Sequence, residues 1–153
     1  MSLSSGEPLA ASHFRVFIEG REFGFSEVGR PSSETDLTTA GQLTHRFETV
    51  VLRRAVTGAR DLYEWRRGIA EGRDDKRTVT IAQLDGPGGR AVNAWQLLRA
   101  WPRRWSGPSF HALRAEVAME ELELAFDDLL WIRDLSWLQT VSCETSANPT
   151  EGG

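Results

Sequence analysis

The sequence predicts a mainly β protein with one or two helices, in the α+β class. Several short segments alternate apolar and polar residues, which is typical of strands with one buried face. One internal segment instead has the three- and four-residue apolar spacing of an amphipathic helix. The chain has 153 residues, of which 40% are hydrophobic, and this is enough for one domain with a buried core.

The N-terminal part predicts a hairpin. His13–Glu19 alternates as a first strand, Gly20–Arg21 forms the turn and Glu22–Val28 returns. The expected buried face of the first strand carries Phe14, Val16 and Ile18. Arg30–Gln42 is rich in Ser and Thr and lacks a sustained period, so we expect a loop there. Leu43–Arg54 resumes strand character.

A helix of about four turns is predicted after Thr57, which has the hydroxyl of an N-cap residue. Leu62, Trp65 and Ile69 recur along one face of it. Gly72 stands where a C-terminal cap belongs.

Two further strands are predicted around a turn. Arg77–Leu84 is the first, Asp85–Gly89 is the turn cluster, and Ala91–Trp105 begins as the second. Pro102 cannot donate a ladder hydrogen bond, so it marks an edge, a bulge or a strand end.

Ser109–Leu130 is compatible with both helix and strand. Its composition favours helix, whereas its local pattern favours a strand in two pieces of opposite parity. The apolar residues are Val117 and Met119 in the first piece, and Leu122, Leu124 and Phe126 in the second. A β-bulge near Glu120–Glu121 would place all five on one face.

The chain ends are predicted to be simple. Asp127–Leu138 is predicted to be a strongly apolar helix, and the polar residues 139–153 predict a disordered tail. We expect a flexible N-terminus over residues 1–12 and one domain over residues 13–138. The expected core anchors are tryptophans, whose indole N–H groups need partners: Trp65, Trp95, Trp101 and Trp105.

Composition argues against several classes of function. The net charge is −4 and the arginines come in pairs, so no specific nucleic-acid binding is expected. The histidines lack metal-ligand spacing and no catalytic motif is present. We therefore expect that the protein is not an enzyme and binds neither a metal nor a cofactor. Cys143 is alone. No leader and no apolar run of about 20 residues is found, so we expect cytoplasmic synthesis without membrane insertion.

The glutamates before the C-terminal segment form a dense group: Glu116, Glu120, Glu121 and Glu123. Unpaired buried carboxylates are costly, so we expect at least half of these groups to face water.

Four pieces of the chain carry a family resemblance. They are Phe14–Gly20 with Gly24–Val28, Thr49–Thr57 running into Leu62–Arg66, Ala100–Pro108, and Glu116–Ala125. In this order they resemble the tail tube proteins of contractile phages and the inner tube proteins of related contractile injection systems. The resemblance favours strand for Glu116–Phe126 and implies a tail-tube-like β-sandwich or barrel protomer with one flanking helix.

The resemblance also implies a function. Six copies would form a ring whose sheets join into an inner barrel, and the rings would stack into a conduit for cargo. The implied partners are other tube subunits, sheath proteins and baseplate proteins. The implied location is a phage virion or an injection particle.

Two departures from the family suggest a tube-initiator or baseplate-adaptor ring. Gly29–His45 is shorter than the corresponding family segment, and the apolar Leu129–Leu138 extends past the usual end. The candidate inter-subunit contacts are Leu37, Thr38, Thr39, Leu43, Leu130, Ile132, Leu135, Trp137 and Leu138. An alternative of another class is a monomeric β-barrel that binds a small ligand in a pocket lined by the tryptophans.

Overall fold

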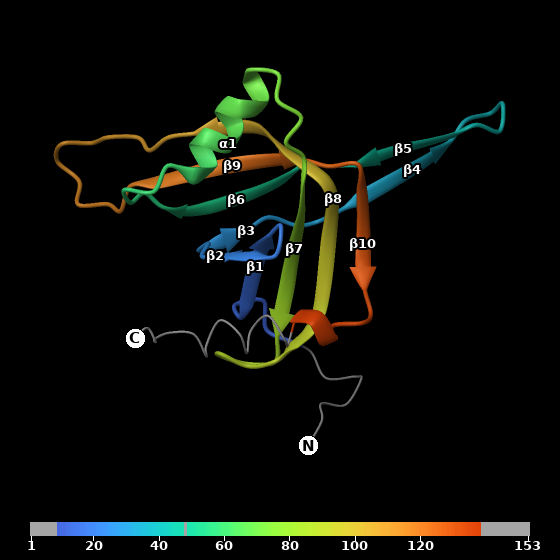
Figure 1. Cartoon of the computed structure of the whole chain (residues 1–153), viewed down its shortest axis with the longest axis horizontal. Coiled ribbons are helices and arrows are strands. Elements are labelled where there is room, and N and C mark those ends of the chain that lie inside the picture. The colour runs from blue at the N-terminus through green and yellow to red at the C-terminus, as the bar shows by residue number, and fades with distance from the viewer. Residues whose placement is uncertain (1–8, 48, 139–153) are drawn as a thin grey trace.

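The computed structural model describes residues 9–47 and 49–138, which are mainly β with one flanking helix (Figure 1). The strands are β1 (Phe14–Ile18), β2 (Arg21–Phe23), β3 (Glu27–Val28), β4 (Ser33–Leu37), β5 (Leu43–Phe47), β6 (Val50–Ala55), β7 (Arg77–Leu84), β8 (Ala91–Ser106), β9 (Met119–Ala125) and β10 (Asp128–Ile132). The helix is α1 (Asp61–Ala70), and a helical turn covers 136–138. The tail predicted at 139–153, Cys143 and most of the predicted N-terminal segment lie outside the described residues.

Two antiparallel sheets share the long strand β8 (Figure 1). Its first half pairs with β7 on one edge and with β10 on the other, in the order β2-β1-β7-β8-β10. Its second half pairs with β9, in the order β8-β9-β6-β3. We call the second group the four-stranded sheet. Arg99 has a positive φ of 53° at the point where β8 passes from one group to the other.

The main core lies between these sheets and α1. It combines residues from both sheets with the buried face of the helix. The most deeply buried members are Val16, Ile18, Val50, Leu52, Leu62, Trp65, Val79, Leu97, Ala100, Leu122 and Leu124. A smaller cluster on the far face of β1, β7 and β8 joins Phe17, Ala82 and Ala94 to Leu138.

The helix and the start of the first hairpin agree with the sequence analysis, but the predicted returning strand Glu22–Val28 is wrong over its second half, because β3 is a separate strand that pairs with β6. β1 and β2 pair around Glu19 and Gly20, whose φ values of 54° and 80° fit the primed turns that favour hairpins. Gly72 follows α1 with a φ of 94°, as a C-terminal glycine cap requires. Thr57 is not the N-cap, because the helix starts after Arg60 and the Thr57 hydroxyl accepts from Ala59 instead.

The loop predicted at Arg30–Gln42 is wrong over part of its length. β4 lies within it and pairs with β5 in a two-stranded hairpin that projects from the body (Figure 1). β4 is exposed along its whole length, so burial leaves no alternating pattern that sequence analysis could detect. The predicted strand Leu43–Arg54 is correspondingly two strands, β5 and β6.

Strand rather than helix is confirmed for the acidic segment, but the predicted bulge at Glu120–Glu121 is wrong. β9 alternates regularly, with Glu120, Leu122 and Leu124 inside, and Val117 lies exposed before the strand. The irregularity is in β8 between Pro102 and Arg104, which confirms a bulge as one of the roles expected of the proline.

The helix predicted over Asp127–Leu138 is wrong over most of its length, because only residues 136–138 are helical. β10 occupies residues 128–132 and pairs with β8. Leu129 packs toward the main core while Ile132 packs toward the smaller cluster. A strand with apolar contacts on both faces gives a continuous apolar run, which periodicity cannot distinguish from a buried helix.

Candidate functional site

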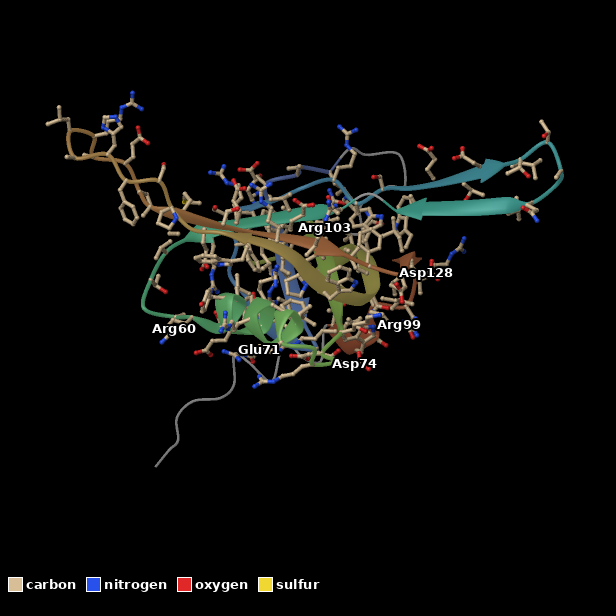
Figure 2. The ribbon with its side chains drawn as sticks, turned by 90° about the horizontal axis from the view of Figure 1, so that it is seen from above. Arg60, Glu71, Asp74, Arg99, Arg103 and Asp128 are labelled. Atoms are coloured by element: carbon tan, nitrogen blue, oxygen red, sulfur yellow. The ribbon has the colours of Figure 1, made fainter. Side chains whose placement is uncertain are left out.

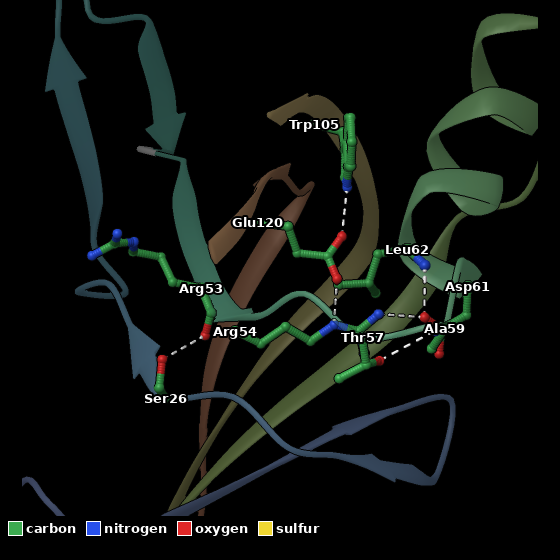
Figure 3. Close-up of polar contacts among 9 residues, drawn as sticks. All are labelled: Ser26, Arg53, Arg54, Thr57, Ala59, Asp61, Leu62, Trp105 and Glu120. Carbon is green, nitrogen blue, oxygen red and sulfur yellow. Dashed lines mark hydrogen bonds and ion pairs between the residues drawn. The ribbon is translucent and has the colours of Figure 1, made fainter. Parts of the chain in front are cut away.

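A buried ion-pair network ties the start of α1 to the four-stranded sheet (Figure 3). Arg54 on β6 donates from Nε to Oε2 of Glu120 over 2.7 Å and from Nη2 to Asp61. Trp105 on β8 donates its indole N–H to Oε1 of Glu120 over 2.8 Å. Glu120 is only 4% exposed, so its charge is compensated by these two donors rather than by water.

The same arginine stabilises the ionised form of Asp61 at the helix start. Burial acts to raise the pKa of Asp61, but the hydrogen bond and the charge of Arg54 outweigh it, so the pKa is lowered from its ordinary value. Tyr63 packs edge-on against Trp105, with ring centroids 5.2 Å apart. The helix is therefore fixed on the core face of the four-stranded sheet.

The other face of the four-stranded sheet, which we call the charged face, carries ion pairs across its strands. Arg53 on β6 lies between Glu27 on β3 and Glu121 on β9, with N–O distances of 3.1 and 2.9 Å. These three residues are cross-strand partners, so they form one transverse row.

A second row crosses the charged face beside the first. Arg104 on β8 is the cross-strand partner of Glu123 on β9, which is opposite Val51 on β6. Arg103, at the bulge, lies 3.4 Å from Glu123. The two rows together hold three arginines and three glutamates, so the charged face has no net formal charge.

The four-stranded sheet has two open edges. β3 is its last strand on one side, and the second half of β8 is its last strand on the other. Among the described residues β9 is the only strand that pairs with residues 101–106, because β7 reaches no further than Ala100. Unpaired edges of this kind are ready to pair with another chain.

Two apolar projections lie at opposite ends of the molecule (Figure 2). The β4–β5 hairpin carries Leu37 and Leu43, which are 69% and 63% exposed. The loop between β8 and β9 carries Phe110 and Leu113, which are 86% and 93% exposed. The hairpin is joined to the first residue of β6, Val50. The loop is joined to the first residue of β9, and this end of β9 pairs with the last residues of β6.

The predicted core tryptophans occupy different environments. Trp65 is buried and donates its N–H to the Asp75 carbonyl over 2.7 Å. Trp95, Trp101 and Trp105 are half-buried. Their role as anchors stays a prediction.

The predicted contact residues divide by position. On the β4–β5 hairpin, Thr38 and Thr39 are exposed like the two leucines, and the Thr38 N–H bonds the Gln42 carbonyl. Leu138 is buried in the smaller cluster, against which three more of these residues pack: Ile132, Leu135 and Trp137. Leu130 is exposed on β10.

Sequence analysis missed Trp131 as a surface residue. It is 65% exposed, its ring lies 5.4 Å from that of Trp95, and its N–H donates to Asn93. The Arg54 network was missed as well. The only feature of the sequence that indicates this network is the pair of consecutive arginines in β6. Side chains of consecutive residues in a strand point to opposite faces, so one of the two arginines must enter the core.

An apolar groove of about 590 Å³ opens between β1, β7 and β3. Phe14, Val28, Ile81 and Trp95 lie in its lining, while Trp101 and Trp105 do not. The groove therefore does not match the tryptophan-lined pocket of the small-ligand alternative.

No group of three or more metal-ligating side chains occurs within residues 9–47 and 49–138. In the same part of the chain, the structure contains no helix with the length and hydropathy of a membrane span.

Comparison with known proteins identifies the fold. A chain of the PVC sheath–tube complex of an extracellular contractile injection system is 21% identical with a TM-score of 0.68, covering 87% of this chain and all of that one. A chain of the anti-feeding prophage tube terminating cap is 18% identical with a TM-score of 0.67, over 88% and 97% of the two chains. Hcp1 from Flavobacterium johnsoniae is 10% identical with a TM-score of 0.58, over 78% and 94%.

These likenesses establish a shared fold. A search of curated protein sequences finds no match. The sequence profile of the T4-like virus tail tube protein gp19 family matches residues 10–130, which include β1 to β9 and α1. The chain therefore belongs to the T4-like virus tail tube protein gp19 family.

Proposed function

We propose that this protein is a structural subunit of the inner tube of a contractile phage tail or a contractile injection system. In this proposal six copies form a ring, and rings stack into a conduit enclosed by sheath proteins and seated on a baseplate. Membership of the tail tube family supports it, as does the likeness to a chain of a sheath–tube complex. The role is structural and involves no catalysis.

The observation that carries the proposal is the four-stranded sheet with two open edges. Pairing of these edges between copies would satisfy their backbone groups and extend the sheet around a ring. The core, α1 and the other sheet all lie on one side of it. When such subunits close a ring, the bulky side takes the larger radius, so the charged face lines the conduit.

The apolar projections at opposite ends suit stacking. An exposed two-stranded hairpin is marginally stable on its own, so the β4–β5 hairpin gains from a neighbour that covers it. Leu37 and Leu43 at one end and Phe110 and Leu113 at the other give unlike surfaces, as head-to-tail contact between rings requires.

A terminal or adaptor ring is a second candidate, and the exposed edge of β10 favours it. Leu130 and Trp131 are exposed there, and aromatic residues are enriched at protein–protein interfaces. In this version the edge engages a baseplate component or another tube subunit. Leu135, Trp137 and Leu138 pack on their own protomer instead.

Sedimentation and negative-stain imaging of the purified full-length protein test the proposal. A repeating tube subunit gives rings that grow into tubes with rising concentration, whereas an adaptor gives rings that stop growing. The double variant Leu37→Ser, Leu43→Ser should keep rings and lose tubes, because both side chains are exposed in the protomer. A wild-type protein that stays monomeric at every concentration would refute both candidates.

A further inference from the structure

We propose that residues 101–106 of β8 in one copy pair with β3 of the next copy, with Arg104 beside Glu27 of that neighbour. The inference rests on the proposed function, because it names the residues that join neighbouring subunits in the ring. The occupant of each open edge is a second copy of this chain.

Strand direction supports this pairing. All neighbours in the order β8-β9-β6-β3 are antiparallel, so β3 runs in the direction of β9 and opposite to β8. A rotation about a ring axis preserves these directions. The second half of β8 in one copy and β3 in the next therefore meet as antiparallel strands, and the alternation continues without interruption around the ring.

The two edges carry opposite charges on the same face. Arg104 and the bulge residue Arg103 lie on the β8 edge, and Glu27 lies on the β3 edge. Glu27 and Arg104 are both exposed. Within residues 9–47 and 49–138 no carboxylate lies within ion-pair distance of the Arg104 guanidinium, whereas Arg103 already has Glu123 at 3.4 Å. The charged face of each protomer thus offers an arginine at one edge and a glutamate at the other. They lie in neighbouring cross-strand rows, so the contact between copies joins the row of Arg104 to the row of Glu27.

This arrangement selects against the wrong partner edges. Pairing β8 with β8 would place arginine against arginine, and pairing β3 with β3 would place glutamate against glutamate. Like charges opposite each other on adjacent strands are destabilising, whereas unlike charges are stabilising. Charge complementarity therefore favours the head-to-tail contact that closes a ring over the two-fold contact that ends in a dimer.

Charge reversal tests the inference on the full-length protein. Arg104→Glu places glutamate against Glu27 of the neighbour, and Glu27→Arg places arginine against Arg104. Each variant should need at least a tenfold higher protein concentration for half-assembly than the wild type, as measured by sedimentation. Arg90→Glu, at an exposed arginine in the β7–β8 turn, is the matched control and should assemble like the wild type.

Mixing the two single variants is the decisive step. In an alternating ring, each introduced glutamate meets an introduced arginine at one contact, and a native Arg104 meets a native Glu27 at the next. Every contact is then again between opposite charges. An equimolar mixture should recover rings, and native mass spectrometry should find equal numbers of the two variants in each. The chain carrying both substitutions should also form rings by itself. Recovery shows in addition that the single variants are folded.

The outcomes separate the inference from the proposed function. A wild type without rings overturns the proposed function and the pairing that rests on it. Wild-type rings that persist unchanged in Arg104→Glu and Glu27→Arg overturn the pairing alone. Loss of rings in both variants without recovery in the mixture or in the double variant also overturns it, since the effect is then not one of complementary charge.

Discussion

Replacement of Arg54 by Met should destabilise the protomer strongly. The change keeps most of the apolar stem but removes the guanidinium that neutralises Glu120, which is 4% exposed and cross-strand from Arg54. Breaking a buried ion pair by removing one partner costs about 3–5 kcal/mol. Trp105 still donates to Glu120, and Asp61 can turn toward water, so we expect a value of about 3 kcal/mol, at the lower end of that range.

Urea unfolding followed by tryptophan fluorescence measures this cost. The matched control is Arg53→Met, the adjacent residue on the same strand, which pairs on the charged face with Glu27 and Glu121, whose side chains are 63% and 45% exposed. Exposed pairs contribute about 0–1 kcal/mol, so the control should lose no more than that. In the Arg54→Met background, Glu120→Gln should restore part of the loss, because a neutral amide costs less to bury than a carboxylate. Equal effects of the two arginine substitutions would refute the reasoning.

Three further predictions concern the protomer. Gly89→Ala should cost about 1–2 kcal/mol in urea unfolding, which is typical of a single substitution. Its Cβ would stand 2.0 Å from Oδ1 of Asp85 and would displace the carboxylate that accepts from the Arg90 N–H, whereas Gly86→Ala meets nothing within 4 Å and should cost less. Trp65→Ala should cost about 3–5 kcal/mol because the ring is buried in the main core, and an unchanged melting temperature would contradict this. The Arg77 hydrogen bond lowers the pKa of Asp75, so the stability this carboxylate contributes is present above its ordinary pKa of 3.8 and is lost as pH falls through the lower folded value. Asp75→Asn should therefore flatten the acid limb of a plot of stability against pH.

Much of the fold follows from local pattern. β1 and β7 are where the analysis places them, although both of their faces are buried. Val16 and Ile18 in β1, and Val79 and Ile81 in β7, recur at every second position on the face of the main core. The apolar stripe of α1, formed by Leu62, Trp65 and Ile69, can be recognised in the sequence in the same way. In these elements the large apolar residues that face the main core recur with one regular period, so the sequence carries the information directly.

The errors occur where burial does not impose a single period. β4 is exposed throughout, and β10 has apolar contacts on both faces, so neither alternates. The bulge in β9 is expected on the assumption that every inward-facing residue of this strand is apolar. Glu120 faces inward and is charged, so the assumption does not hold. It lies inside because Arg54 and Trp105, distant in sequence, supply its partners. Pairings of this kind and the identity of open edges depend on tertiary contacts that one sequence does not display.

A cryo-EM reconstruction of the wild-type protein at a concentration that supports assembly tests the central claim most directly. The account predicts a closed ring with six times the 17.1 kDa protomer mass, in which the four-stranded sheets join edge to edge and Glu121 and Glu123 line the central channel. A monomer at all concentrations, or a ring whose channel is lined by α1 instead of the charged face, would contradict it.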